Sequence, residues 1–274
     1  MKNRAFKLLR TTIIILSVLF ALFPFYVMVK NSFEPFSRIT SSTFHFLPES
    51  FYIENYKTLI LQYPILRWML NSIIVCVFLI IGTVFFSVFS AYALTRLDFI
   101  GKKVVFVIIM GSMIIPEQVV IVPLYNLTNS LGWINTYSAL IFPSMISAFG
   151  VLLLRQYFAS IPYELDEAAI IDGCNRVDVL WRIIIPNAKP AIATLVVIKF
   201  MWTWGKFLWP SLAINSENMR TLPVGISYFK TSAATDPWDM TITGSMFLVI
   251  PIVLLFISMQ KYFVKGLTDG AIKG

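Results

Sequence analysis

Three charged side chains lie inside stretches that are otherwise apolar: Glu117, Lys199 and Lys206. An unpaired charge at the centre of a bilayer costs about 2.5 to 3.5 kcal/mol on insertion scales. If these stretches cross a membrane, the charged groups should therefore face a partner or a water-filled path. Lys199 and Lys206 are seven positions apart, so a regular helix would place them on one face.

Aromatic side chains accompany the two lysines. Trp202 lies between them on the same predicted face, and the stretch also contains Trp204 and Phe207. Aromatic rings cover the apolar face of a sugar while polar groups meet its hydroxyls, which favours a saccharide pathway. Interfacial aromatic residues and snorkelling lysines produce the same pattern, so that alternative stays open. The candidate pathway residues are Glu117, Lys199, Trp202, Trp204, Lys206 and Phe207.

The sequence predicts no catalytic or metal site. The single histidine, His45, has no cysteine or second histidine nearby, and Cys76 and Cys174 are expected to be free thiols. Hydrolase and zinc-protease motifs are missing, as is the Gly-rich loop with Lys-Ser/Thr that binds nucleotide phosphates. Any nucleotide hydrolysis must then belong to another protein.

A polar segment, residues 160–186, interrupts the apolar stretches, and we call it the polar loop. Ser160 favours a helix start, Gly173 a helix end, and Asn175 the start of a second helix. The second helix is expected to end before Pro186. The polar loop is therefore predicted to contain two short helices.

The first of these helices has a face suited to contact. Leu165, Ala168, Ala169 and Asp172 recur at helical spacing. The small alanines would let another protein approach the carboxylate of Glu167. The alternative is an amphipathic segment that packs under its own helices.

Composition places the chain in a bilayer. Of its 274 residues, 58% are hydrophobic and 13% are charged, whereas about a quarter of the residues in a soluble domain are charged. The basic residues are scattered, which argues against a nucleic-acid surface. We predict an all-α membrane protein with a tail of residues 1–10, a membrane domain 11–262 and a tail 263–274. The six predicted spans are about 11–29, 71–94, 104–127, 136–157, 191–214 and 241–262.

Positive charge predicts the orientation. Of the 22 Lys and Arg residues, 14 lie on the side of the N-terminus and 6 on the opposite side. Cytoplasmic loops carry the excess of Lys and Arg. Both termini and the polar loop are therefore expected to be cytoplasmic.

The polar loop resembles the cytoplasmic coupling loop, or EAA loop, of permease subunits in binding-protein-dependent ABC importers. The resemblance rests on Glu167-Ala-Ala-x-x-Asp-Gly173 followed by Ile183-x-Ile-Pro186 and Pro190. Further stretches resemble the carbohydrate branch of this family, specifically the maltose-type short permease subunit. They include Ala91-Tyr-Ala-Leu-Thr-Arg96, Leu131-Gly-Trp-Ile-Asn-Thr136 and Lys265-Gly-Leu-Thr-Asp-Gly-Ala-Ile-Lys-Gly274.

The resemblance implies a type I importer permease of six transmembrane helices in a bacterial or archaeal cell (inner) membrane. It implies a homologous second permease subunit, two ATPase subunits that use ATP and magnesium, and an extracytoplasmic binding protein that delivers a saccharide. This chain itself would bind no cofactor. Coupling to the ATPase would involve Glu167, Ala168, Ala169, Asp172, Gly173 and Pro186, and the ATPase-interface tail would involve Gly266, Thr268 and Gly270.

A secondary transporter driven by an ion gradient is the alternative. Such a protein is expected to place ionisable residues or broken helices at the midplane, commonly in repeated halves. Glu117 is the single carboxylate inside a predicted span. A membrane enzyme lacks support from any catalytic motif.

Overall fold

A computed structural model describes residues 2–48, 51–232 and 237–271, and every regular element in these ranges is a helix. The predicted all-α fold is thus confirmed. The chain forms two compact units, Met1–Leu66 with Gly225–Ile250 and Arg67–Val224 with Pro251–Gly274.

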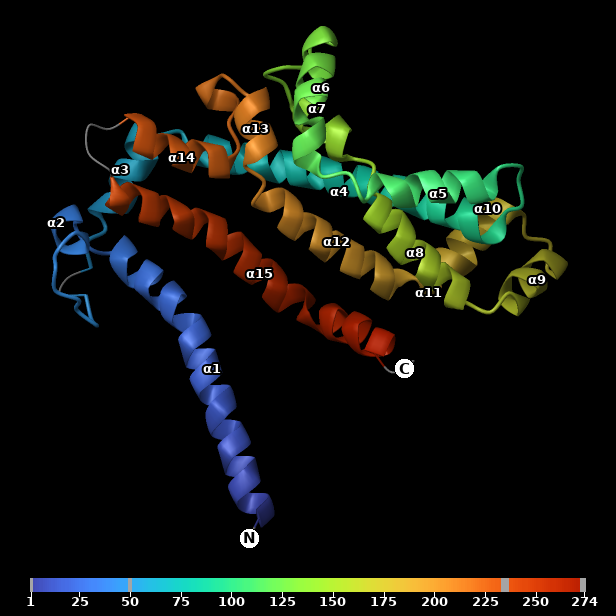
Figure 1. Ribbon diagram of the computed structural model, residues 1–274, viewed down its shortest axis with the longest axis horizontal. Coiled ribbons are helices and arrows are strands. Elements are labelled where there is room, and N and C mark those ends of the chain that lie inside the picture. The colour runs from blue at the N-terminus through green and yellow to red at the C-terminus, as the bar shows by residue number, and fades with distance from the viewer. Residues whose placement is uncertain (1, 49–50, 233–236, 272–274) are drawn as a thin grey trace. The chain divides into compact units, whose positions relative to one another are not determined.

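Helices follow one another with short connections (Figure 1). In chain order they are α1 (Lys2–Ser32), α2 (Phe36–Ile39), α3 (Glu54–Gln62), α4 (Ile65–Arg96), α5 (Lys102–Ser112), α6 (Glu117–Ser130), α7 (Tyr137–Ile141), η1 (Phe142–Ser144), α8 (Ala148–Ser160), α9 (Glu164–Ile171), α10 (Arg176–Asp178), η2 (Val179–Ile184), α11 (Ile185–Asn187), α12 (Lys189–Trp204), α13 (Leu208–Ala213), η3 (Glu217–Met219), α14 (Leu222–Ser232) and α15 (Trp238–Ala271).

Three segments are single helices long and apolar enough to cross a membrane: Phe6–Ser32, Ile65–Arg96 and Trp238–Ser258. Three further candidates are pairs of helices bent at a short break, by 101° between α5 and α6, 42° between α7–η1 and α8, and 73° between α10–α11 and α12. The described residues therefore contain three to six candidate spans, and the sequence predicted six.

The predicted third span is broken. Helix α5 ends at Ser112, and α6 begins at Glu117 after an extended Pro116. Proline disfavours a helical residue before it and donates no backbone hydrogen bond, so the helix stops there. Pro123, by contrast, lies inside α6. The break puts Glu117 at the start of a helix.

The predicted fifth span is also two helices. Helix α12 has 16 residues and ends at Trp204. Gly205 is its C-cap, and α13 begins at Leu208 and includes Pro210. At about 1.5 Å per residue, α12 is shorter than the hydrocarbon core of a bilayer. Lys206 consequently lies in the turn between the two helices. Contrary to the prediction from sequence, it does not share a face of one regular helix with Lys199.

A core of buried side chains joins the polar loop to α4, α8 and α12, which Figure 1 shows gathered at one end of α4. The helices approach closely, since a Cβ atom at Gly150 of α8 would lie 2.4 Å from Ser87 Oγ of α4. The members of this core are Val88, Ala91, Tyr92, Leu154, Phe158, Ile161, Ala169, Val179, Leu180, Ile184, Ala188, Ala191 and Leu195. The polar loop is thus part of a packed body.

The other end of α4 holds the connection after α13. Asn71 Nδ2 donates to the backbone oxygens of Asn218 and Arg220, both at 2.8 Å. Its Oδ1 accepts from Tyr137 Oη at 2.7 Å. One amide thus ties α4 to α7 and to the segment that leads into α14.

In the first unit, polar contacts hold the end of α1. Lys30 Nζ lies 3.2 Å from Glu34 Oε2, and both side chains are buried. Asn55 Nδ2 of α3 donates to the backbone oxygen of Glu34 at 2.8 Å. Lys30 also donates to the backbone oxygen of His45, a loop residue as predicted.

The predicted C-terminal tail begins inside a helix. Helix α15 extends to Ala271, beyond the predicted end of the sixth span at residue 262. Gly266, Thr268 and Gly270 have a helical backbone, while their side chains lie outside the described residues. The Gly-rich sequence therefore continues the helix rather than starting a separate peptide.

Candidate functional site

The polar loop begins later than predicted. Ser160 is the last residue of α8, and its hydroxyl donates to the backbone oxygen of Tyr157 at 2.7 Å. Helix α9 starts at Glu164, and its N-cap residue, Tyr163, makes no side-chain cap. The prediction of Ser160 as a helix start was wrong, because the side chain bonds back to the preceding turn. Three acidic residues in the first turn of α9 complement its dipole instead.

Gly173 ends α9 as predicted. Its φ is +88°, a left-handed conformation that favours glycine. The N–H of Cys174 donates to the oxygen of Ala169 at 2.9 Å, and the N–H of Gly173 donates to that of Ile170 at 3.0 Å. This pair of bonds is a Schellman motif. The left-handed turn is therefore enough to favour glycine at this position, whether or not Gly173 also contacts a partner.

Asn175 starts the next helical segment, also as predicted. Its Oδ1 accepts from the N–H groups of Val177 and Asp178, both at 2.9 Å, while Asp178 Oδ2 accepts from the N–H of Asn175 at 3.2 Å. These bonds form a capping box. They set the direction in which the following helical segment, residues 176–187, leaves the turn. We call this segment the second arm of the polar loop.

The second arm does not end before Pro186. It continues as the π-helical segment η2 and then as α11, in which Pro186 is near the start. Proline donates no backbone hydrogen bond, and here it follows directly on the π-helical segment, where the regular helical bonding already changes. The chain bends at Ala188, with 73° between α10–α11 and α12. Pro186 thus lies inside a helix, two residues before this bend.

The two sides of α9 differ in exposure. Glu167, Ala168 and Asp172 are exposed, whereas Asp166 and Ala169 are buried. The predicted contact face treated the two alanines alike, but Ala169 belongs to the core and Ala168 faces outward. Adjacent residues are about 100° apart on a helix, so packing on one side separates them.

Several large apolar side chains of the polar loop are exposed, as Glu167 is. Ile171 is 85% exposed and Trp181 is 56% exposed. Leu165, Ile170 and Val177 are exposed as well. Exposed apolar groups of this size mark surfaces that contact other proteins or lipid.

The buried side of α9 contacts the end of α4. Arg96 Nε lies 2.7 Å from Asp166 Oδ2, and both side chains are almost fully buried. Arg96 Nη2 donates to the backbone oxygen of Ile161 at 2.8 Å. Burial raises the pKa of the Asp166 carboxyl above its ordinary value, while the Arg96 guanidinium opposes that shift. Our sequence reasoning missed this pair, because nothing local connects its members.

The three charged groups predicted inside the membrane come together. Lys206 Nζ lies 2.5 Å from Glu117 Oε1 and 3.1 Å from Ser144 Oγ. Lys199 Nζ donates to the backbone oxygen of Ser144 at 2.8 Å. The two lysines thus reach the same residue although a helix end separates them. Each charged group has a partner, as its cost in an apolar medium requires.

These groups line a cavity of about 470 Å³, a size typical of small-molecule sites. Trp202 is 55% exposed and packs edge-on against Phe149, with ring centroids 5.1 Å apart. The lining is Leu79, Glu117, Val120, Leu124, Pro143, Ser144, Ile146, Lys199, Trp202, Thr203 and Lys206.

Two of the predicted pathway residues lie elsewhere. Trp204 is 2% exposed and stacks on Phe200 at 5.3 Å, so it belongs to the core. Phe207 is exposed but does not line the cavity. Of these three aromatic residues, Trp202 lines the cavity. Trp204 lies about 200° from it on the same helix, and Phe207 follows the break after α12.

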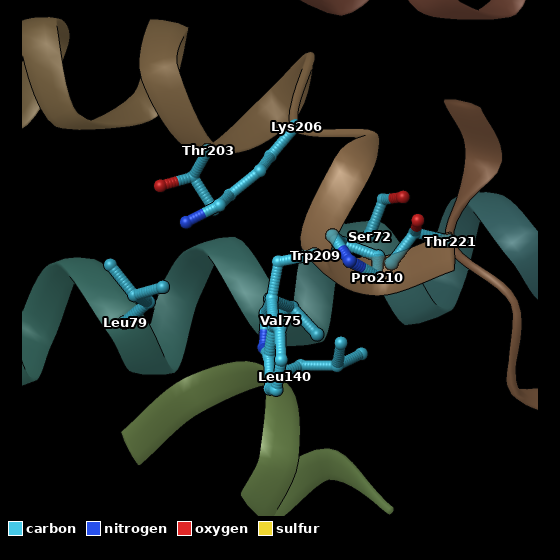
Figure 2. A pocket seen from close by; sticks show the side chains of 9 residues that line it. All are labelled: Ser72, Val75, Leu79, Leu140, Thr203, Lys206, Trp209, Pro210 and Thr221. Carbon is cyan, nitrogen blue, oxygen red and sulfur yellow. The ribbon is translucent and has the colours of Figure 1, made fainter. Parts of the chain in front are cut away.

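Next to this cavity is a much smaller one, of about 20 Å³. Figure 2 shows Lys206 extending back from the end of α12 toward Thr203, above Val75 and Leu79 of α4. The side chain of Trp209 lines the small cavity and donates from Nε1 to the backbone oxygen of Ala139 at 2.8 Å. Lys206 thus lies over the side chains of Val75 and Leu79, and it lines both the small cavity and the larger one. No group of three His, Cys, Asp or Glu side chains suited to a metal occurs among the described residues.

Residues 83–269 match the family "binding-protein-dependent transport system inner membrane component". The match covers more than half of the chain. The chain belongs to this family.

Relatives match the sequence of this permease along almost its whole length. The permease AraQ of an arabinooligosaccharide transport system from Bacillus subtilis is 34% identical, covering 94% of this chain and 92% of its own. MalG of the trehalose/maltose transport system from Thermococcus litoralis is also 34% identical, covering 95% and 94%. A crystal structure of a bacterial ABC transporter that imports alginate contains a chain of the same fold, with a TM-score of 0.82, 24% identity, and 96% and 98% coverage.

Gly173→Val in this permease should weaken coupled transport several-fold, whereas Gly173→Asn should retain most of it. A left-handed residue costs roughly 1 to 2 kcal/mol for most side chains, and asparagine tolerates it best. No atom lies within 4 Å of the position where a Cβ would be. ATP hydrolysis and uptake by the reconstituted complex would measure both variants. Equal loss in the two would show that the lost property is close fit to a partner rather than the turn.

Proposed function

We propose that this permease subunit translocates a saccharide, delivered by an extracytoplasmic binding protein, in an ATP-driven ABC importer. The observation that carries the proposal is the polar loop, a packed body with Glu167 and large apolar side chains on its free side. The family is one of binding-protein-dependent transport systems, and relatives of this length are named for arabinooligosaccharide and trehalose/maltose transport.

The polar loop would dock into a cleft of an ATPase subunit. Glu167 would meet a basic residue there, and Ile171 and Trp181 would fill apolar hollows beside it. The small side chain of Ala168 would let the ATPase approach closely. Asp172 and Gly173 would lie at the edge of the contact surface. Two ATPase subunits would bind ATP and magnesium, and a homologous second permease would complete the membrane part. The C-terminal segment with Gly266, Thr268 and Gly270 would reach the ATPase interface.

The cavity beside α12 would form part of the saccharide path. Trp202 offers an aromatic face, while Lys199, Lys206 and Glu117 offer donors and an acceptor. A sugar has apolar CH faces and hydroxyl edges, so it needs both kinds of group. The positive-charge bias supports cytoplasmic termini and a cytoplasmic polar loop, in a bacterial or archaeal inner membrane.

Reconstitution tests the proposal. The complex with its neighbouring permease, ATPase and binding-protein partners would be placed in lipid vesicles, and ATP hydrolysis measured against a panel of mono- and oligosaccharides. We expect stimulation by one binding protein together with one saccharide, and uptake of that saccharide. Transport by this chain alone under an ion gradient, with no ATPase bound, would overturn the proposal in favour of a secondary transporter.

A further inference from the structure

The end of α4 forms a clamp on the polar loop. Arg96 is the last residue of α4, and its guanidinium makes three contacts with one short stretch. It pairs with Asp166 at 2.7 Å, donates to the oxygen of Ile161 at 2.8 Å, and lies 5.0 Å from the ring centroid of Tyr163. A planar guanidinium suits such a set, whereas an ammonium does not.

A second contact from α4 reaches the other arm of the loop. Tyr92, one turn before Arg96, donates from its hydroxyl to the backbone oxygen of Arg176 at 2.8 Å. Tyr92 is 7% exposed. The last turn of α4 therefore holds both α9 and the start of α10, on either side of the Gly173 turn.

The ion pair between Arg96 and Asp166 differs from a surface ion pair because both side chains are buried. The Arg96 and Asp166 side chains are 5% and 6% exposed. Removing one member would leave a buried charge without compensation, which commonly costs about 3 to 5 kcal/mol. Asp166 is also the immediate neighbour of Glu167. Holding Asp166 against α4 turns Glu167 to the free side of α9.

We propose that Arg96 and Asp166 are positioning residues that make α9 move together with α4, so that displacement of the polar loop by an ATPase reaches the membrane helices. The proposal rests on the proposed docking of the polar loop. The contacts of Arg96 and Tyr92 would form a rigid connection between α9 and α4 in place of a hinge. Without the clamp, the ATPase would move α9 while α4 lagged behind.

Alanine variants test the clamp in the full reconstituted complex. We expect Arg96→Ala and Asp166→Ala each to raise the ATP hydrolysed per saccharide transported by about fivefold or more. The double variant should be no worse than either single variant, because both remove one interaction. Arg96→Lys should give an intermediate ATP-to-saccharide ratio. A lysine keeps the positive charge, but it lacks the planar guanidinium that contacts Asp166, Ile161 and Tyr163 together. A wild-type ATP-to-saccharide ratio in both single variants, with reduced thermal stability, would show a purely structural pair and overturn the proposal.

A distance measurement on an otherwise intact complex avoids variants that fail to fold. Spin labels at Phe89→Cys of α4 and Glu164→Cys of α9, both exposed positions, would be placed in a background lacking Cys76 and Cys174. We expect the same label distance with and without trapped ATP. A change of about 5 Å, one turn of helix, would overturn the clamp. ATPase co-purification with the labelled complex is scored separately, and its absence would count against the docking proposal rather than the clamp.

Discussion

Uptake by the reconstituted complex should fall at least about tenfold when Glu167 is replaced by lysine. The carboxylate is exposed on α9, beside Ala168 and opposite the buried Ala169. Because the Glu167 side chain is exposed and makes no hydrogen bond or ion pair within the part of the chain that the structure describes, the variant should reach the membrane in normal amounts. A lysine would bring like charges together in the proposed ATPase cleft, so the ATPase should co-purify poorly.

Glu164→Lys provides the matched control. Glu164 is exposed on the same helix and carries the same charge, but it lies one turn before the surface formed by Glu167 and Ile171. We expect this variant to retain most uptake and normal ATPase association. Normal uptake by Glu167→Lys would contradict the assignment of Glu167 as the anchor. Equal loss in the two variants would show a general effect of charge on α9.

Replacement of Lys206 by glutamate should reduce uptake by about tenfold or more, with the ATPase still bound. The change would put two carboxylates together where Lys206 Nζ now lies 2.5 Å from Glu117 Oε1. Repulsion would open the cavity wall and leave Lys199 as the one ammonium there. Radiolabelled saccharide uptake and ATPase co-purification would measure the two effects separately.

Two further variants interpret that result. Lys206→Glu combined with Glu117→Lys restores the pair in reverse, and we expect it to recover part of the uptake, with a KM for transport above that of the wild type. Lys57→Glu is the control for an ion pair in general, because Lys57 pairs with Glu54 at 2.6 Å with both side chains more than half exposed. Exposed pairs contribute little, so its uptake should be near normal. Unchanged uptake by Lys206→Glu would remove the cavity from the path.

Part of the candidate site could be predicted from sequence because it depends on local rules. The capping box of Asn175 and the Schellman turn at Gly173 involve bonds across a few residues, and both are observed. The same rules failed at Ser160 and Pro186. There the deciding factor was how the flanking helices α8 and α11 continued, and the residue types alone did not contain that information.

The cavity shows the same division. Hydropathy predicted that Glu117, Lys199 and Lys206 need partners, but the partners were not identified. They depend on a break after Ser112 and another after Trp204. These breaks bring Glu117 to Lys206. Trp202 and Trp204 lie about 200° apart on α12, so Trp204 is buried while Trp202 lines the cavity.

Hydropathy and capping act over one helical turn or one span, so the residues alone predict an all-helical membrane protein with a capped polar loop. The burial of Ala169 next to an exposed Ala168, and the pairing of Asp166 with Arg96, are properties of the folded chain. Those outcomes depend on which side of α9 packs against α4. Residues distant in the chain set that side, and the buried guanidinium of Arg96 requires a carboxylate partner there.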